Sequence, residues 1–200
     1  LPYETVNCIK TLELTTQQTA TGFHPFLTVG TAYQKCEDRP IRGRGIVFDV
    51  AEVIPEPGRP ETNRKLRLKG ITEFKGPVFA LTSLSDGNVA ISLGPKVVIH
   101  AFEEDEKFAG VAFHDIGTCS LALASLKNFF VTADLTKSVA FLAFQAEPLA
   151  RIHALGRDYG QNLQCTSVEF LVNSDGQVMI VTADDQGGLH FYSYAPSSKI

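Results

Sequence analysis

The feature that most constrains this chain is a short motif that recurs at intervals of about 40–50 residues. Each copy has an apolar strand, a turn of small residues and a second strand with aromatic ends. The copies, in chain order, are Val29–Ala32 with Ile46–Val50, Ile91–Gly94 with Val97–Phe102, Val131–Asp134 with Val139–Phe144, and Val181–Asp184 with Leu189–Tyr194. A repeat of this length, built from strands, is typical of the blades of a β-propeller.

The rest of the sequence agrees with this interpretation. Runs rich in β-branched and aromatic residues include Phe26–Val29, Gly45–Val50, Val78–Leu81, Lys96–His100, Val139–Leu142 and Leu189–Tyr192. The pairs Asp86-Gly87, Asp175-Gly176 and Gly187-Gly188 suit tight hairpins. The sequence therefore predicts an all-β fold: a β-propeller with WD-like repeats and about four blades of four antiparallel strands, at roughly 45 residues per blade. An ordinary β-sandwich is the alternative, but it does not explain why the small-residue turn recurs in register with the aromatic strand.

Propeller rings have about 4–8 blades, so a ring can need more sequence than this chain supplies. The chain also starts at Leu1 rather than at a methionine. We therefore expect residues 1–200 to be part of one β-propeller domain, as a fragment of a larger multi-propeller protein.

Composition argues against several functional classes. A net charge of −4 is unlike that of a protein that holds nucleic acid mainly through its own electrostatic field. No apolar run approaches the roughly 20 residues that cross a bilayer, so no membrane contact is predicted. The four cysteines are isolated along the chain and are expected to be reduced thiols, which points to the nucleus or the cytosol.

No catalytic constellation is visible. The sequence lacks a Gly-x-Ser-x-Gly elbow and a phosphate-binding loop, and its histidines do not have metal-ligand spacing. His100 and His190 hold corresponding positions in two repeats and are interpreted as semi-buried strand residues. Asp134 and Asp184 recur beside a tight turn, where an aspartate accepts hydrogen bonds from turn amides. The sequence therefore predicts no enzyme activity, no cofactor and no metal.

Two groups of basic residues are candidates for RNA contact. The first group is Arg39, Arg42 and Arg44, and the second is Lys65, Arg67 and Lys69. Alternation along a strand places the second group on one face, opposite Leu66 and Leu68. Such a row could bind phosphates or could be a solvated strand face, and no aromatic stacking partners are interleaved with it.

A proline-rich segment interrupts the strand pattern. It consists of Pro55, Glu56, Pro57, Gly58, Arg59 and Pro60. Because proline removes a ladder donor and restricts φ, this segment must leave the sheet as a loop. It is either a surface that docks a partner or an ordinary hairpin loop, and physical reasoning leaves both interpretations open.

The chain resembles one known family, the large subunit of the cleavage and polyadenylation specificity factor, in its C-terminal propeller region. The segments that carry the resemblance are Val6–Leu12, Val29–Ala32, Arg42–Val50, Glu52–Pro60, Lys75–Leu81 and Lys127–Asp134. Parts of this pattern are shared with the damaged-DNA-binding adaptor of the cullin ligases and with the large propeller subunit of the U2 splicing particle. The Val53–Gly58 loop points to the polyadenylation member and favours a family-specific role for that loop.

The resemblance implies a nuclear, non-catalytic scaffold of three propellers that works in pre-mRNA 3′-end cleavage and polyadenylation. In that family the large subunit holds a second propeller subunit and a zinc-finger subunit, which read the polyadenylation signal. The protein would then contact pre-mRNA through the other subunits of the complex, or directly. The alternatives are a direct RNA-binding module of the same complex and a propeller adaptor of a cullin ubiquitin ligase or a splicing particle.

Overall fold

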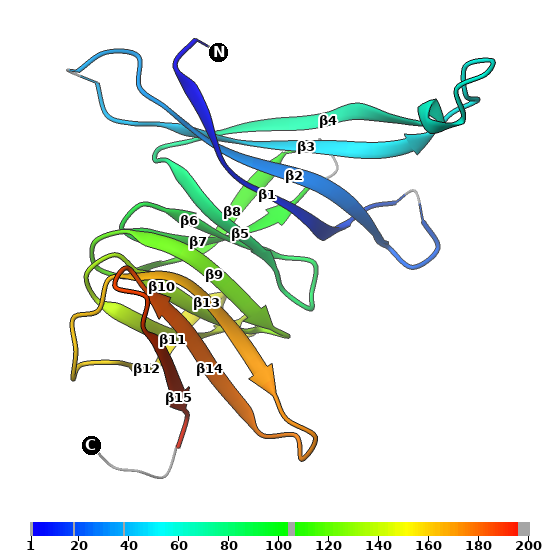
Figure 1. Ribbon diagram of the computed structural model, residues 1–200. Helices are drawn as coiled ribbons and strands as arrows, with labels where there is room; N and C mark the ends of the chain where they lie inside the picture. The colour runs from blue at the N-terminus through cyan, green and yellow to red at the C-terminus, as the bar shows by residue number, and fades with distance from the viewer. Residues whose placement is uncertain (1, 18, 38, 104–106, 196–200) are drawn as a thin grey trace.

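The chain folds into four antiparallel β-sheets (Figure 1). The computed structural model describes residues 2–17, 19–37, 39–103 and 107–195. The first sheet contains β1 (Glu4–Thr15), β2 (Phe23–Tyr33), β3 (Gly43–Glu52) and β4 (Arg64–Phe74). The second contains β5 (Val78–Ser83), β6 (Val89–Leu93), β7 (Lys96–Phe102) and β8 (Phe108–Asp115). The third contains β9 (Ser120–Leu126), β10 (Phe129–Asp134), β11 (Ser138–Gln145) and β12 (Arg151–Arg157). The fourth contains β13 (Cys165–Val172), β14 (Val178–Asp184) and β15 (Leu189–Ser193).

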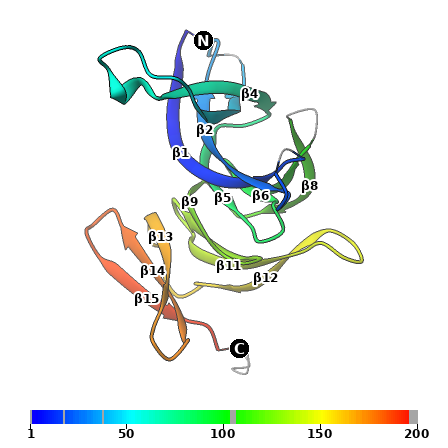
Figure 2. The ribbon, with the colours of Figure 1, turned by 90° about the vertical axis from the view of Figure 1, so that its right-hand side faces the viewer.

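Each sheet is an up-and-down meander, because strands that are neighbours in the sheet are also neighbours in the chain. The sheets follow one another in chain order, with the first and the fourth at opposite ends of the stack (Figure 1 and Figure 2). The predicted all-β fold of propeller blades is confirmed. Three blades have four strands, and the fourth has three within the described residues. The one helical element in that part of the chain is a short 3₁₀ turn, η1 (Pro60–Thr62).

The sequence repeat corresponds to the second and third strands of each sheet. Its four copies form β2–β3, β6–β7, β10–β11 and β14–β15. Two of the predicted turns contain Gly87 and Gly187, whose φ angles are 79° and 82°. Glycine reaches these angles without the steric cost that a side chain would add. The hairpins expected from the sequence are therefore present at the expected residues.

Apolar side chains fill the space between successive sheets. The core between the first and second sheets includes Leu14, Phe26, Phe74, Val89 and Ile91. The next core, between the second and third sheets, includes Ala90, Ile99, Phe130 and Leu142. The third core includes Val131, Ala133, Val168 and Ile180. Because strand residues alternate between faces, each middle sheet contributes to two cores, and this burial stabilises the stack.

Asp134 closes the β10–β11 hairpin, as the sequence predicts. Its carboxylate is buried. Oδ1 accepts hydrogen bonds from the amides of Thr136 (2.9 Å) and Lys137 (3.0 Å), and Oδ2 accepts from those of Thr118 (3.1 Å) and Cys119 (2.9 Å). Asp134 therefore joins the turn to the segment that leads into β9, which is a structural role.

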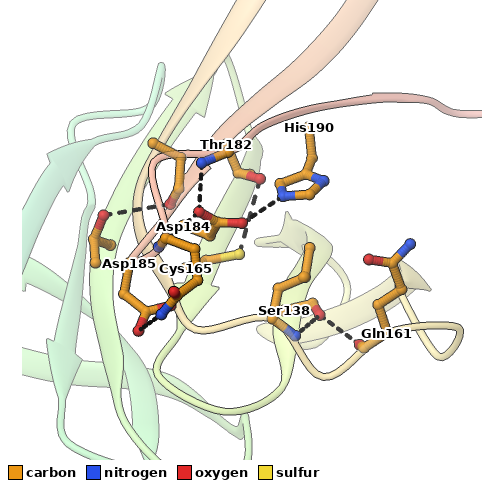
Figure 3. Close-up of polar contacts among 12 residues, drawn as sticks. Ser138, Gln161, Cys165, Thr182, Asp184, Asp185 and His190 are labelled. Carbon is orange, nitrogen blue, oxygen red and sulfur yellow. Dashed lines mark hydrogen bonds and ion pairs between the residues drawn. The ribbon is translucent and has the colours of Figure 1, made fainter.

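Asp184 has the corresponding role in the fourth sheet (Figure 3). Its Oδ1 accepts hydrogen bonds from the amides of Gln186 (2.9 Å) and Gly188 (2.6 Å), and its Oδ2 lies 2.7 Å from Nε2 of His190. The bond with His190, followed by the Gly188 amide, lowers the pKa of Asp184. His190 is thus a strand residue that holds a turn carboxylate, in agreement with its interpretation from the sequence.

His100 lies in the core between the first and second sheets. It is buried, and its ring centroid is 5.0 Å from that of Phe74 and 6.3 Å from that of Phe108. Burial penalises the charged imidazolium and lowers the pKa of His100 from 6.5 to about 4. The folded protein therefore holds this histidine in its neutral form at neutral pH.

Acidification is expected to weaken this core. Because the unfolded chain takes up the proton first, the stability contributed by neutral His100 is complete above pH 6.5 and is lost as the pH falls toward about 4. Between about pH 7.5 and about pH 5 the free energy of unfolding should fall by about 2 kcal/mol from this group alone. Denaturant titration of the chain at both pH values measures the loss. His100→Gln should flatten the profile in this window, and an unchanged profile in that variant would contradict the assignment.

Candidate interaction surfaces

β3 and β4 extend beyond the rest of the first sheet as a two-stranded arm (Figure 1). The pairing of β2 with β3 ends where Leu27 lies opposite Phe48. Beyond that point β3 pairs with β4 alone, as far as Glu52 opposite Arg64. We define the arm as residues 49–67. Most side chains on the arm are exposed, because no other sheet of the described residues packs against either face of the arm as it does against the inner parts of the sheets.

The proline-rich loop forms the tip of the arm. Its six residues, Pro55 to Pro60, are all exposed. Hydrogen bonds brace the tip: Val53 N to Asn63 O (2.8 Å), Glu56 N to Thr62 Oγ1 (2.8 Å) and Arg59 N to Glu56 O (2.9 Å). The neighbouring side chain of Ile54 is 95% exposed. The arm therefore presents an exposed apolar side chain, that of Ile54, beside a tip whose backbone is braced by hydrogen bonds.

Two of the predicted RNA-binding residues lie along the arm. Lys65 and Arg67 are exposed on β4, opposite Ala51 and Asp49 of β3. Asp49 also lies 3.3 Å from Nε2 of His24, measured from its Oδ1. The acidic Asp49 next to Arg67 offsets part of the positive charge on this face.

Lys69 departs from the strand geometry expected from the sequence. The register passes from Val47 opposite Gly70 to Phe48 opposite Leu68, which leaves Lys69 as the extra residue of a β-bulge. A bulge interrupts the alternation of side chains and bends the strand. The three cations therefore do not follow one regular strand face.

The other basic group is partly engaged in ion pairs. Nε of Arg44 donates to Oε1 of Glu4 (2.8 Å), Nη2 of Arg44 pairs with Oε2 of the same carboxylate, and the hydroxyl of Thr31 also donates to Oε1 (2.6 Å). The Arg44 guanidinium is the main reason that the pKa of Glu4 falls to about 2. Arg42 lies 3.3 Å from the carboxylate of Glu73. Arg44 thus ties β3 to β1 and is not presented to a ligand.

The first sheet also has an apolar face that the sequence reasoning missed. Two in-register rows cross its four strands. The first row is Ile9, Val29, Ile46 and Ile71, and the second is Thr11, Leu27, Phe48 and Leu68. Ile9 is 62% exposed, Leu68 55% and Ile71 42%. We call these two rows the outer face. The alternation of Ile46 and Phe48 along β3 was the available signal, but alternation in one strand does not say that both faces of a sheet are apolar.

The described residues contain no grouping of three or more His, Cys, Asp or Glu side chains that could hold a metal ion. Over the same part of the chain, no helix has the length and apolar character needed to cross a membrane.

Sequence comparison identifies the relatives of this chain. Residues 2–200 match the family described as the CPSF A subunit region. The chain is 33% identical to Protein cft1 of Schizosaccharomyces pombe over 175 residues, which is 87% of this chain and 12% of that protein. It is 31% identical to cleavage and polyadenylation specificity factor subunit 1 of Drosophila melanogaster over 198 residues, 99% of this chain and 13% of that protein. It is 35% identical to Protein CFT1 of Saccharomyces cerevisiae over 171 residues, 86% of this chain and 12% of that protein.

The chain thus spans about an eighth of the length of these relatives, as the 12% and 13% coverage shows. The match includes the strands of all four sheets, so the sheets described above are features of the matched region. This chain belongs to the CPSF A subunit family.

Proposed function

We propose that the chain is part of one propeller, the C-terminal one, of a non-catalytic scaffold subunit in the nuclear machinery for pre-mRNA 3′-end cleavage and polyadenylation. The observation that carries this proposal is the family match over residues 2–200. It is supported by the name of the Drosophila relative, cleavage and polyadenylation specificity factor subunit 1. The other subunits of that factor, including a second propeller subunit and a zinc-finger subunit, are the proposed partners.

The local chemistry supports a scaffold rather than an enzyme. The repeated aspartates, Asp134 and Asp184, direct their oxygens to turn amides and to His190. His100 is buried in an aromatic core. These groups have structural partners, and a propeller can instead bind other proteins through its loops and faces.

We propose the arm as the docking element. Its Pro55–Pro60 tip extends away from the sheets (Figure 1) and is exposed. A braced backbone has less conformational entropy to lose on binding, so the same contacts give a higher affinity. Proline residues at the tip leave fewer amide donors in need of a partner. The exposed Ile54 beside the tip supplies an apolar anchor.

Direct RNA contact through Lys65, Arg67 and Lys69 is the second candidate. The exposure of Lys65 and Arg67 on the arm favours it. Asp49 beside Arg67 and the bulge at Lys69 count against it, because they reduce the charge and break the line of cations. Protein docking is therefore the function that this surface supports better.

Excision of the arm tip together with its flanking residues, Ile54 among them, tests the proposal. Residues 53–63 are replaced by Asn-Gly, a pair that closes two-residue hairpins, since Glu52 already lies opposite Arg64. In the full-length protein, purified from nuclear extract, recovery of a polyadenylation subunit should fall at least about tenfold, the loss expected when an anchored contact is removed. Hydrogen exchange of β5–β12 should not change. Retention of every partner would contradict the docking role of the tip.

A matched charge variant separates the two candidates. Lys65→Glu with Arg67→Glu keeps the tip and should leave partner recovery unchanged. If this pair instead abolishes a salt-sensitive affinity for RNA, direct RNA contact replaces protein docking as the role of the arm. Recovery of cullin-ligase or splicing components with the unmodified protein would overturn the proposed complex altogether.

A further inference from the structure

We propose that β3 binds an extended segment of a partner subunit as an added β-strand, with an apolar residue of that segment opposite Val50 and a basic residue opposite Glu52. The binding element is the edge of residues 49–52 that faces away from β4, which we call the open edge. This inference rests on the proposed docking function of the arm. It deepens that function by naming the main-chain groups that bind and the kind of segment they fit.

Along the open edge, β3 has a strand partner on one side only. β2 pairs with β3 as far as Leu27 opposite Phe48 and then turns away from it (Figure 1). Oδ1 of Asp49 lies 3.3 Å from Nε2 of His24, across the point where the two strands part. Within the described residues, no strand pairs with the open edge beyond that contact.

The separation of β2 from β3 has a cause in the sequence. Tyr33 and Arg42 exchange two main-chain hydrogen bonds, of 2.8 and 3.0 Å. Such pairs recur at every second residue of an antiparallel ladder, so this register would next place Val50 opposite Pro25 as a hydrogen-bonded pair. Because proline has no N–H, the carbonyl of Val50 receives no donor from β2. Pro25 therefore ends the ladder and leaves the edge of β3 open.

The main-chain groups at the open edge point outward. Val53 N donates to Asn63 O at 2.8 Å, so the odd-numbered residues of this part of β3 direct their main-chain groups toward β4. Val50 and Glu52 alternate with them and direct their N–H and C=O groups away from β4. Both residues are exposed. An incoming strand would therefore meet a donor and an acceptor at each of these two residues, as strand addition requires.

The other edge of the arm, that of β4, is protected against pairing. It carries Lys65, Arg67 and Lys69, and it is bent by the bulge at Lys69. Lysine side chains and bulges are features by which proteins keep edge strands from pairing. Residues 49–52 contain neither a lysine nor a bulge. Of the two edges, the open edge is therefore the one suited to strand addition.

The side chains of the open edge indicate the chemistry of the segment. Val50 is 42% exposed and lies opposite Leu66, which is 53% exposed, so an apolar residue on an incoming strand would extend an apolar row. Glu52 lies on the same face, where a basic residue opposite it gives a favourable cross-strand pair. A second copy of this edge, or RNA, would instead bring negative charge to Asp49 and Glu52. A partner peptide is therefore the occupant that fits.

Hydrogen exchange at single-residue resolution tests the proposal in the full-length protein, alone and with the other purified subunits of the polyadenylation factor. The amides of Val50 and Glu52 should exchange at least about tenfold more slowly in the complex, because a new ladder protects them. Leu66 is the matched control, since it lies opposite Val50 and directs its N–H to the outer edge of β4. Its exchange should not change. Unchanged exchange at Val50 in the complex would overturn the proposal.

Proline substitution is an independent test. Val50→Pro removes an outward N–H at the open edge and no bond between β3 and β4, and Leu66→Pro does the same at the other edge of the arm. Recovery of partner subunits should fall at least about tenfold in Val50→Pro and should be unchanged in Leu66→Pro. Equal losses in the two variants would overturn the proposal, because they would show that the arm as a whole is required rather than its open edge.

A failure of this inference is distinct from a failure of the proposed function. If excision of residues 53–63 lowers partner recovery but Val50→Pro does not, the arm docks a partner by other means and the open edge is not the binding element. If the polyadenylation subunits do not bind the full-length protein at all, the proposed function fails and this inference fails with it.

Discussion

Phe130→Ala is expected to lower the free energy of local unfolding of the third sheet by about 3–5 kcal/mol. Phe130 is 0% exposed and lies opposite Leu142 in the core between the second and third sheets. Truncation removes buried apolar area and leaves a cavity, because β-strands held by ladders on both sides cannot collapse into the space. This loss should exceed that from truncating an exposed residue of the same strand.

Hydrogen exchange in the full-length protein measures this loss, since the protection of β9–β11 amides reports local opening. Phe129→Ala is the matched control. Phe129 is the preceding residue of the same strand, is 43% exposed and points to the other face, with its ring centroid 5.9 Å from that of Phe141. Its truncation should cost about 1 kcal/mol. Equal losses in the two variants would contradict the placement of Phe130 in the core.

Asp134→Ala should cost about 3–4 kcal/mol, the second large effect. The buried carboxylate accepts hydrogen bonds from four backbone amides, two in its own turn and two in the segment before β9. Alanine leaves those donors without their acceptor, and buried donors without a partner are costly. We expect the β10–β11 turn and the start of β9 to lose protection together.

Asp184→Ala provides the comparison within the same molecule. Asp184 occupies the corresponding repeat position, but it accepts from two backbone amides and from His190. Its replacement should cause a smaller loss of protection, confined to the β14–β15 turn. A loss at Asp134 no larger than that at Asp184 would show that the bridge from Asp134 to the β9 segment contributes little.

Much of the fold could be predicted because the information is local. Strand propensity, alternation and turn chemistry act over a few residues. The repeat adds a second observation of the same turn, because Asp134 and Asp184 occupy corresponding positions and each accepts hydrogen bonds from amides of its own turn. The hairpins β10–β11 and β14–β15 follow directly from these rules. The resemblance to the polyadenylation family then supplied the link to function, which the strands alone could not.

The candidate surfaces were less predictable because they depend on contacts between distant residues. The pairing of Glu4 with Arg44 joins residues separated by forty positions and removes Arg44 from the set of possible phosphate ligands. The bulge at Lys69 arises from the register of β4 against β3. That register depends on both strands, so it cannot be predicted from Lys69 itself. The length of the arm depends in the same way on where the pairing of β2 stops.

The sequence by itself determined the strands, the hairpin turns and the repeated blade, since those depend on side chains near one another in the chain. Only the tertiary structure decided which faces are covered. Ile91 and Ile46 are both apolar strand residues, yet Ile91 is buried because the first sheet lies over it, while Ile46 belongs to the outer face. Burial is a property of two surfaces in contact, so one strand's sequence cannot specify it alone.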